Sequence, residues 1–319
     1  PAVDETSYFD RQSKTYFVGD KGDEIANYSV NYKTNTTVIR STSLNFYTDA
    51  LLRADNTLVT SDDALAMSVS YKKDSILSNL VAASTPEAVL TDRQSKTFFL
   101  GDKGDEIANY SLNYKTGTLI VRSTSLNFYN VTRDWDNNAA TPDTTQPTRA
   151  DNLYVTSDDA LAMSVNYKAE KDITGITTPD MSIDQRQSKT FFVGEKGDEI
   201  ADYSVNFKTG TTTIRSTSVN FYTTGLKRAT DVSVTADDAL SMSVNYKKAL
   251  LLDLTASTTD DPALRNLDLI QTPDSNIPDD PTTPAVDETS YFDRQSKTYF
   301  VGDKGDEIAN YSVNYKTNT

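Results

Sequence analysis

Apolar and polar residues alternate with a period of two along several short stretches of the chain. The clearest stretch is 28–33, in which Tyr28, Val30 and Tyr32 alternate with polar residues, and this alternation is typical of a half-buried β-strand. The stretch 14–19, KTYFVG, is rich in aromatic and β-branched residues and runs into a corner that contains Gly and Asp. That pattern predicts a strand followed by a turn. Together the two stretches predict a pair of β-strands.

A third strand is predicted at 37–48, after a short polar segment at 33–36 that reads KTNT. The counterparts of that segment at 115–118 and 208–211 read KTGT. Because Gly supplies the positive φ that a tight turn between antiparallel strands needs, these segments predict hairpin turns.

The third strand carries apolar and charged residues on the same parity. Leu44 and Phe46 alternate with polar residues, and Arg40 shares their parity, as Arg122 and Arg215 do in the later copies. An arginine that faces inward needs a carboxylate partner, because an unpaired buried charge is costly. We expect acidic residues at the strand corners to supply that partner.

A second half of each unit repeats the first more faintly. GDEIANYSVNYK at 22–33 aligns without gaps to SDDALAMSVSYK at 61–72, where Met67, Val69 and Tyr71 replace the three apolar residues of the first half. Both halves should therefore present one face to a common core. Packing of sheet on sheet satisfies this most simply. The predicted fold class is all-β, with tandem small β-sandwich modules, Ig-like or jelly-roll-like, joined by extended linkers.

The sequence also repeats at two longer distances. Residues 284–319 are identical to 1–36, so the long period is 283 residues, and we expect the chain to be a segment of a larger tandem repeat protein. The motif RQSKT recurs within that period, at Arg11, Arg93, Arg186 and Arg294. The predicted organisation is module 1 at 8–75, module 2 at 90–170 with a loop insertion at 130–150, module 3 at 183–250, a Pro/Asp/Thr-rich linker at 251–290, and the first part of a next module at 291–319.

Composition excludes several classes of chemistry. Cysteine and histidine are both absent, which removes disulfides, thiolate and histidine metal sites, and Ser-His-Asp or Cys-His catalysis. The formal net charge is −15 without a basic cluster, which disfavours a nucleic-acid partner. No apolar run approaches the roughly 20 residues of a membrane-spanning helix. Modules this small, without disulfides, need support from neighbours or bound ions.

Acidic corners recur at the same place in each module and predict calcium sites. Calcium takes six to eight oxygen ligands, which closely spaced carboxylates can supply, although acids beside glycine also make ordinary solvated turns. The spacing matches no EF-hand loop. The candidate ligands are Asp20, Asp23 and Glu24, Asp102, Asp105 and Glu106, and Glu195, Asp198 and Glu199, with Asp62, Asp63, Asp158, Asp159, Asp237 and Asp238 from the second halves.

Two further motifs have both a structural and a functional interpretation. RQSKT could pair charges with a neighbouring module, but a polar strand face is the interpretation we favour, since surface ion pairs contribute little. Lysine, glutamate and asparagine occur together in each module, as in domains cross-linked by Lys–Asn isopeptide bonds, with Asn27 and Asn109 replaced by Asp202 in module 3. The recurrence of the same acids in three modules indicates that they have a structural role, whereas an enzyme usually has one asymmetric pocket. We predict a non-enzymatic protein without catalytic residues.

The organisation resembles the repetitive regions of large bacterial or archaeal surface proteins, namely adhesins, S-layer-like proteins and extracellular filament proteins. The resemblance rests on acidic, Cys-free, Thr-rich β modules in tandem, and implies an extracellular or cell-surface location. The leading hypothesis is a fibre whose modules stack end to end on copies of themselves or adjacent repeats. The alternative is a multivalent adhesin that binds glycans or surfaces through loops such as 130–150.

Overall fold

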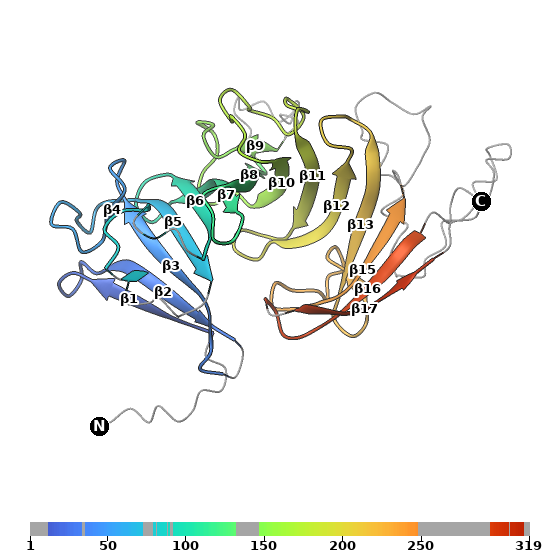
Figure 1. Cartoon of the computed structure of the whole chain (residues 1–319), viewed down its shortest axis with the longest axis horizontal. Helices are drawn as coiled ribbons and strands as arrows, with labels where there is room; N and C mark the ends of the chain where they lie inside the picture. The colour runs from blue at the N-terminus through green and yellow to red at the C-terminus, as the bar shows by residue number, and fades with distance from the viewer. Residues whose placement is uncertain are drawn as a thin grey trace. The chain divides into compact units, whose positions relative to one another are not determined.

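The computed structural model describes residues 12–33, 36–72, 79–80, 82–87, 89, 92–131, 147–247, 294–305 and 307–315. The elements that span described residues from end to end are all β-strands (Figure 1), and Asn79 and Leu80 are helical residues in the connector after β5. The predicted linker at 251–290, and most of the predicted insertion at 130–150, lie outside the described residues.

Each module contributes long strands in the same order, together with one strand of two residues. Module 1 holds β1 (Ser13–Val18), β2 (Ile25–Tyr32), β3 (Ile39–Tyr47), β4 (Leu52–Arg53) and β5 (Leu65–Lys72). Module 2 holds β6 (Arg93–Leu100), β7 (Ile107–Tyr114), β8 (Val121–Tyr129), β9 (Thr148–Arg149) and β10 (Leu161–Lys168). Module 3 holds β11 (Arg186–Val193), β12 (Ile200–Phe207), β13 (Ile214–Tyr222), β14 (Lys227–Arg228) and β15 (Leu240–Lys247), and β16 (Arg294–Val301) and β17 (Ile308–Asn314) follow.

The described chain divides into two compact units, which we describe separately. One unit takes in the residues up to Asp159 together with 166–181, and the other takes in 160–165 and the residues from Ser182 onward. In the first unit the order of antiparallel neighbours is β1, β2, β3, β5, β6, β7 and β8, with β4 and β9 on the ends of β3 and β8. In the second unit the order is β11, β12, β13, β15, β16 and β17, with β14 on the end of β13.

The all-β prediction is confirmed, whereas the described residues do not confirm separate sandwich modules. The last strand of module 1, β5, pairs with the first strand of module 2, β6, in the same antiparallel manner as strands inside a module. β15 and β16 make the corresponding pair in the second unit. Consecutive modules therefore share a sheet at these two boundaries.

One face of each sheet carries the apolar core, as the alternation predicts. In the first unit Leu44, Phe46, Met67, Val69 and Tyr71 are at most 1% exposed. The connector between β5 and β6 covers this face with Leu80 and Ala83. The equivalent core residues of the second unit are Tyr203, Val205, Phe207, Val219, Phe221, Met242, Val244 and Tyr246. In the first unit the core thus lies between the sheet and the connector that covers it.

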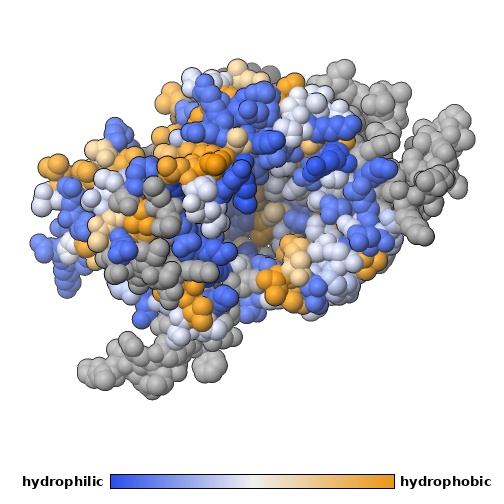
Figure 2. Space-filling view, in the orientation of Figure 1, coloured by the Kyte–Doolittle hydropathy of each residue, from blue (hydrophilic) through white to orange (hydrophobic). Residues whose placement is uncertain are grey.

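The opposite face is lined by small hydroxyl and amide side chains. Thr15 and Ser29 share a hydrogen bond of 2.9 Å across β1 and β2, and Asn31 Nδ2 donates to Ser41 Oγ at 3.1 Å. One row of opposed residues crosses seven strands as Thr15, Ser29, Ser43, Ser70, Ser95, Asn113 and Ser123. Such cross-strand pairs stabilise a sheet by roughly 0.2–1 kcal/mol each. Hydrophilic residues are widespread on the surface in Figure 2, with hydrophobic patches between them.

Glycine meets a geometric requirement at two kinds of turn. Gly117 and Gly210 have φ of 72° and 74°, as the KTGT segments predict. At the start of the β1–β2 corner, Gly19 has φ of 116°, and a Cβ there would lie 2.4 Å from the Asp23 carbonyl oxygen. A side chain at Gly19 is therefore excluded by both backbone conformation and space.

Candidate functional site

The acidic corner between β1 and β2 is a tight turn held by its own backbone. The Asp23 N–H donates to the Asp20 carbonyl at 2.9 Å, and the Gly22 N–H donates to Glu24 Oε2 at 2.9 Å. Both bonds recur in the β6–β7 and β11–β12 corners, with Asp102, Asp105 and Glu106 and with Glu195, Asp198 and Glu199. One carboxylate oxygen at each corner is therefore already used as a hydrogen-bond acceptor within the turn.

The second acidic corner of each module also closes a turn with one carboxylate. Asp63 Oδ2 accepts from both the backbone N–H and the hydroxyl of Thr60, at 2.7 and 3.0 Å. Asp159 with Thr156, and Asp238 with Thr235, repeat this pair of contacts. The preceding acids, Asp62, Asp158 and Asp237, are exposed.

The fold brings the two predicted corners of a module together. Ser61 Oγ donates to Asp23 Oδ1 at 3.1 Å, and Ser157 Oγ donates to Asp105 Oδ1 at 2.7 Å. In module 1 a cavity of about 520 Å³ lies between the corners, with Asp23 and Asp55 in its lining. The module 3 counterpart, of about 340 Å³, is lined by Glu195, Asp198 and Asp237 among others.

The corners do not form a ready-made metal site within the described residues. No three acidic side chains among them are grouped closely enough to hold an ion. Calcium therefore stays a prediction, which rests on recurrence of the corners and on their meeting in space.

The glutamate of each later corner also links two modules, a role that the sequence analysis missed. Glu106 Oε1 accepts the backbone N–H of Leu65, the first residue of β5, at 2.9 Å, while its Oε2 accepts from Gly104. Leu161 donates to Glu199 at 2.8 Å, and Leu240 donates to Glu307 at 3.2 Å. Among the described contacts, Glu24 makes the bond within its own corner alone. The later glutamates, unlike Glu24, therefore accept a hydrogen bond from the preceding module.

Glu106→Ala should lower the free energy of local opening of β5, and Glu24→Ala should lower that of β2. We expect the loss caused by Glu106→Ala to be larger by about 1 kcal/mol. Both changes remove a bond inside a corner, but Glu106→Ala also leaves the Leu65 N–H without its acceptor, and one hydrogen bond contributes about 0.5–1.5 kcal/mol. Amide hydrogen exchange of the two strands measures both values. Equal losses would contradict the inter-module role.

A buried arginine at the end of the two-residue strand β4 makes several hydrogen bonds in module 1. Arg53 is 1% exposed. Its Nε donates to Asn27 Oδ1 on β2 at 2.9 Å, and its Nη1 donates to the carbonyls of Leu80 and Ala83 at 3.3 and 2.9 Å. Burial lowers the pKa of its guanidinium, while nearby Asp55 raises it. Arg53 thus fixes the covering connector to the core face.

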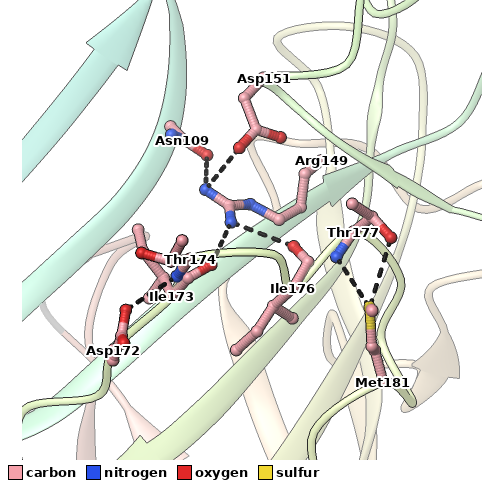
Figure 3. A network of polar contacts seen from close by, with 9 residues as sticks. All are labelled: Asn109, Arg149, Asp151, Asp172, Ile173, Thr174, Ile176, Thr177 and Met181. Atoms are coloured by element: carbon pink, nitrogen blue, oxygen red, sulfur yellow. Dashed lines mark hydrogen bonds and ion pairs between the residues drawn. The ribbon is translucent and has the colours of Figure 1, made fainter.

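Arg149 repeats this arrangement in module 2 (Figure 3). Its Nη2 donates to Asn109 Oδ1 at 2.8 Å and lies 3.2 Å from Asp151 Oδ2. Its Nη1 donates to the carbonyls of Ile173 and Ile176, both at 3.1 Å. These two carbonyls belong to the segment after β10, so the arginine again clamps a connector.

Module 3 has a full ion pair at the same place. Arg228 Nε donates to Asp202 Oδ1 at 2.7 Å, and Nη2 lies 2.5 Å from Oδ2, with the side chains 3% and 5% exposed. We call Arg53, Arg149 and Arg228 the clamp arginines. Asn27, Asn109 and Asp202, the residues considered for isopeptide cross-links, are their partners in the described contacts.

The expectation that Arg40, Arg122 and Arg215 face inward is wrong, because all three are exposed. Arg40 shares the parity of Leu44 but lies at the start of β3, outside the hydrophobic cluster to which Leu44 and Phe46 belong. The sequence does contain a signal for the clamp arginines. An Arg-Ala pair stands before the second acidic corner in every module, at 53–54, 149–150 and 228–229.

The interpretation of RQSKT as a polar strand face fits the described part of the first copy, where Gln12, Ser13 and Thr15 are exposed. It is wrong for the arginine and lysine of the second and third copies, which are buried. Arg93 is 2% exposed, and its guanidinium lies 4.0 Å from the centre of the Tyr114 ring. Arg93 also pairs with Glu87 at 2.8 Å, and Lys96, likewise buried, contacts the same carboxylate. Burial raises the pKa of Glu87, but hydrogen bonds from Lys96 and Arg93 outweigh it and lower the pKa overall. Glu87 belongs to the connector between β5 and β6, so Arg93 and Lys96 also bind this connector to the sheet.

No protein-family model matches the chain, and no curated protein matches it significantly. Among the described elements there is no helix with the length and apolar character needed to cross a membrane.

Proposed function

We propose that the chain is a non-catalytic structural segment of an extracellular or cell-surface fibre, in which tandem modules are joined edge to edge. The observation that carries this proposal is the strand pairing at module boundaries. β5 pairs with β6, and β15 with β16, through registers of the same kind as those inside modules. Repetition then lengthens a sheet without creating a weak point between modules.

The contacts around each boundary support the same proposal. The Leu65 N–H donates a hydrogen bond to Glu106 across the boundary between modules 1 and 2. The Leu240 N–H donates to Glu307 across the boundary in the second unit. The clamp arginines Arg53 and Arg149 bind the connectors that follow β5 and β10. A connector held on the core face protects apolar residues that a neighbouring sheet would otherwise need to cover.

Electron microscopy of chains with one, two and three copies of the 283-residue period tests this proposal. Module 1 contributes four long strands, and strands lie about 4.7–4.9 Å apart, so each module should add roughly 19 Å across the strands. Three modules should add at most roughly 58 Å per copy, since twist and curvature shorten the projection. Rods whose length grows with copy number support the fibre. Compact particles with independently tumbling modules would contradict it.

Calcium binding at the acidic corners is a separate part of the proposal. It is supported by the meeting of the Asp23 and Ser61 corners and by a cavity beside them. An ion that binds only the folded state raises stability by mass action. We therefore expect the melting temperature to rise by several degrees in calcium over chelator, and to rise less after Asp23→Asn and Asp105→Asn. An unchanged melting temperature at saturating calcium would remove this part and leave the fibre unaffected.

A further inference from the structure

Basic residues that are far apart in the sequence gather at one end of the strands. In module 1, β2, β3 and β5 are successive neighbours in the sheet (Figure 1). The Lys33 N–H donates to the Val38 carbonyl across the β2–β3 hairpin, and Ser41 pairs with Lys72 across β3 and β5. Lys33, Arg40 and Lys72 therefore stand at the same end of three strands, and all three are exposed. We call this end of a module, where the hairpin lies, the hairpin margin.

The same three positions are basic in the other modules. The Ala169 N–H donates to the Arg122 carbonyl at 2.9 Å, and Ser216 pairs with Lys247, so the strands meet there as in module 1. The equivalent residues are Lys115, Arg122 and Lys168 in module 2, and Lys208, Arg215 and Lys247 in module 3. All of them are exposed except Lys247, which is half-buried. Each module therefore has a basic hairpin margin, although the sequence itself has no basic cluster.

Acidic residues near the hairpin margin do not cancel its charge. Glu87 is already paired with the buried Arg93 and Lys96. The acidic residues described within two positions of a strand end at this margin are Asp92, Glu170 and Asp184. In every module the basic residues of the margin outnumber them.

The acidic corners occupy the opposite end of the same strands, which we call the corner margin. β2 runs from the first corner of module 1 to the hairpin margin over the eight residues Ile25–Tyr32. At about 3.3–3.4 Å per residue, the two margins are roughly 24 Å apart. Exposed acidic residues of the corner margin are Asp20 and Asp62 in module 1, Asp102 and Asp158 in module 2, and Glu195 and Asp237 in module 3.

The two margins of one module cannot neutralise each other. Charges farther apart than the Debye length, about 8 Å at physiological ionic strength, are largely screened. The rows of hydroxyl and amide side chains that lie between the margins carry no charge. Both margins also expose apolar side chains, since Val38 at the hairpin margin is 52% exposed and Leu58 at the corner margin is 75% exposed. A partner that covered either margin would therefore neutralise charge and bury apolar surface together.

We infer that the hairpin margin of one chain binds the corner margin of a second copy, so that fibres associate side by side. This inference rests on the proposed function, because it adds a lateral contact to a fibre that lengthens by strand pairing. A second copy is the partner that fits, since every module carries a basic and an acidic margin at opposite ends of the same strands. Single exposed ion pairs are weak. Two copies in register make one such contact per module, and the repeated contacts reinforce one another through multivalency.

Sedimentation velocity of the full chain and of two neutralised variants, at low ionic strength with a chelator present, tests this inference. We expect the parent chain to self-associate reversibly, and added salt to abolish the association. The hairpin-margin variant combines Lys33→Gln, Arg40→Gln, Lys115→Gln, Arg122→Gln, Lys208→Gln and Arg215→Gln. The corner-margin variant combines Asp20→Asn, Asp62→Asn, Asp102→Asn, Asp158→Asn, Glu195→Gln and Asp237→Asn. Each variant should weaken self-association by at least about tenfold, because several ion pairs that act together are lost.

The corner-margin variant separates the pairing of margins from the effect of net charge. It brings the chain from its net charge of −15 closer to neutrality, so self-association would strengthen if general repulsion between copies controlled it. Weaker association of this variant supports the inference, and stronger association overturns it. All substituted positions are exposed, so an unchanged melting curve verifies that lost association is not lost folding.

Carbodiimide cross-linking of mixed isotope-labelled and unlabelled chains locates the contact. We expect amide cross-links between copies that join a lysine of the hairpin margin, such as Lys115, to an acid of the corner margin, such as Asp158. A parent chain that stays monomeric at low ionic strength overturns the inference, as does a hairpin margin that binds only an added polyanion such as heparin. Rods that lengthen with copy number but give no such cross-links would leave the fibre standing and remove the lateral contact. Cross-linked, salt-sensitive assemblies without rods would do the reverse.

Discussion

Asp202→Ala should destabilise the sheet around β12 to β14 by about 3–5 kcal/mol, the usual cost of leaving one member of a buried ion pair without its partner. The Arg228 side chain is 3% exposed, and its guanidinium donates to both oxygens of Asp202. Removal of that carboxylate takes away the counter-charge of the buried guanidinium. A chain of several modules need not unfold in one step, so the local free energy of opening should be measured by hydrogen exchange of the β12 and β13 amides.

The chain itself provides the control for this experiment. Asn27 and Asn109 occupy the position of Asp202 in modules 1 and 2 and accept hydrogen bonds from their own clamp arginines. Asp202→Asn should therefore cost no more than about 1.5 kcal/mol, because the acceptor is kept while the charge is lost. A loss as large as that of Asp202→Ala would show that pairing of charge, and not hydrogen bonding, holds the clamp.

The strands could be predicted from the sequence because period two is a local property. Alternation placed Val30, Met67, Val69 and Tyr71 on the buried face, and they are at most 1% exposed. The neighbour of each strand is not local. Alternation states which side chains face a core, but it does not state whether a second sheet or a connector covers that core. The sandwich prediction therefore went beyond what the pattern determines.

The polar residues were harder to place, because composition assigns charged side chains to the surface. Arg93 and Lys96 are buried because Glu87, in a connector of variable sequence, supplies their counter-charge. Arg53 was missed because β4 has two residues, too few for any period. Comparison of the modules with one another, which reveals the Arg-Ala pair before each corner, was the available signal.

Burial along the predicted strands yields the second large prediction. Ile25→Ala should destabilise the region around β2 by about 2–5 kcal/mol, as expected for truncation of a buried isoleucine. Ile25 packs against Tyr47 and Ala54. Val38→Ala truncates another β-branched side chain of module 1, but one that is 52% exposed, so it should change stability by less than about 0.5 kcal/mol.

Hydrogen exchange of the β2 and β3 amides measures both effects. Ile25 is buried against Tyr47 and Ala54, whereas Val38 is exposed, so only the change at Ile25 should speed exchange markedly. Equal costs at the two positions would show that burial of the apolar face does not hold β2 in the sheet.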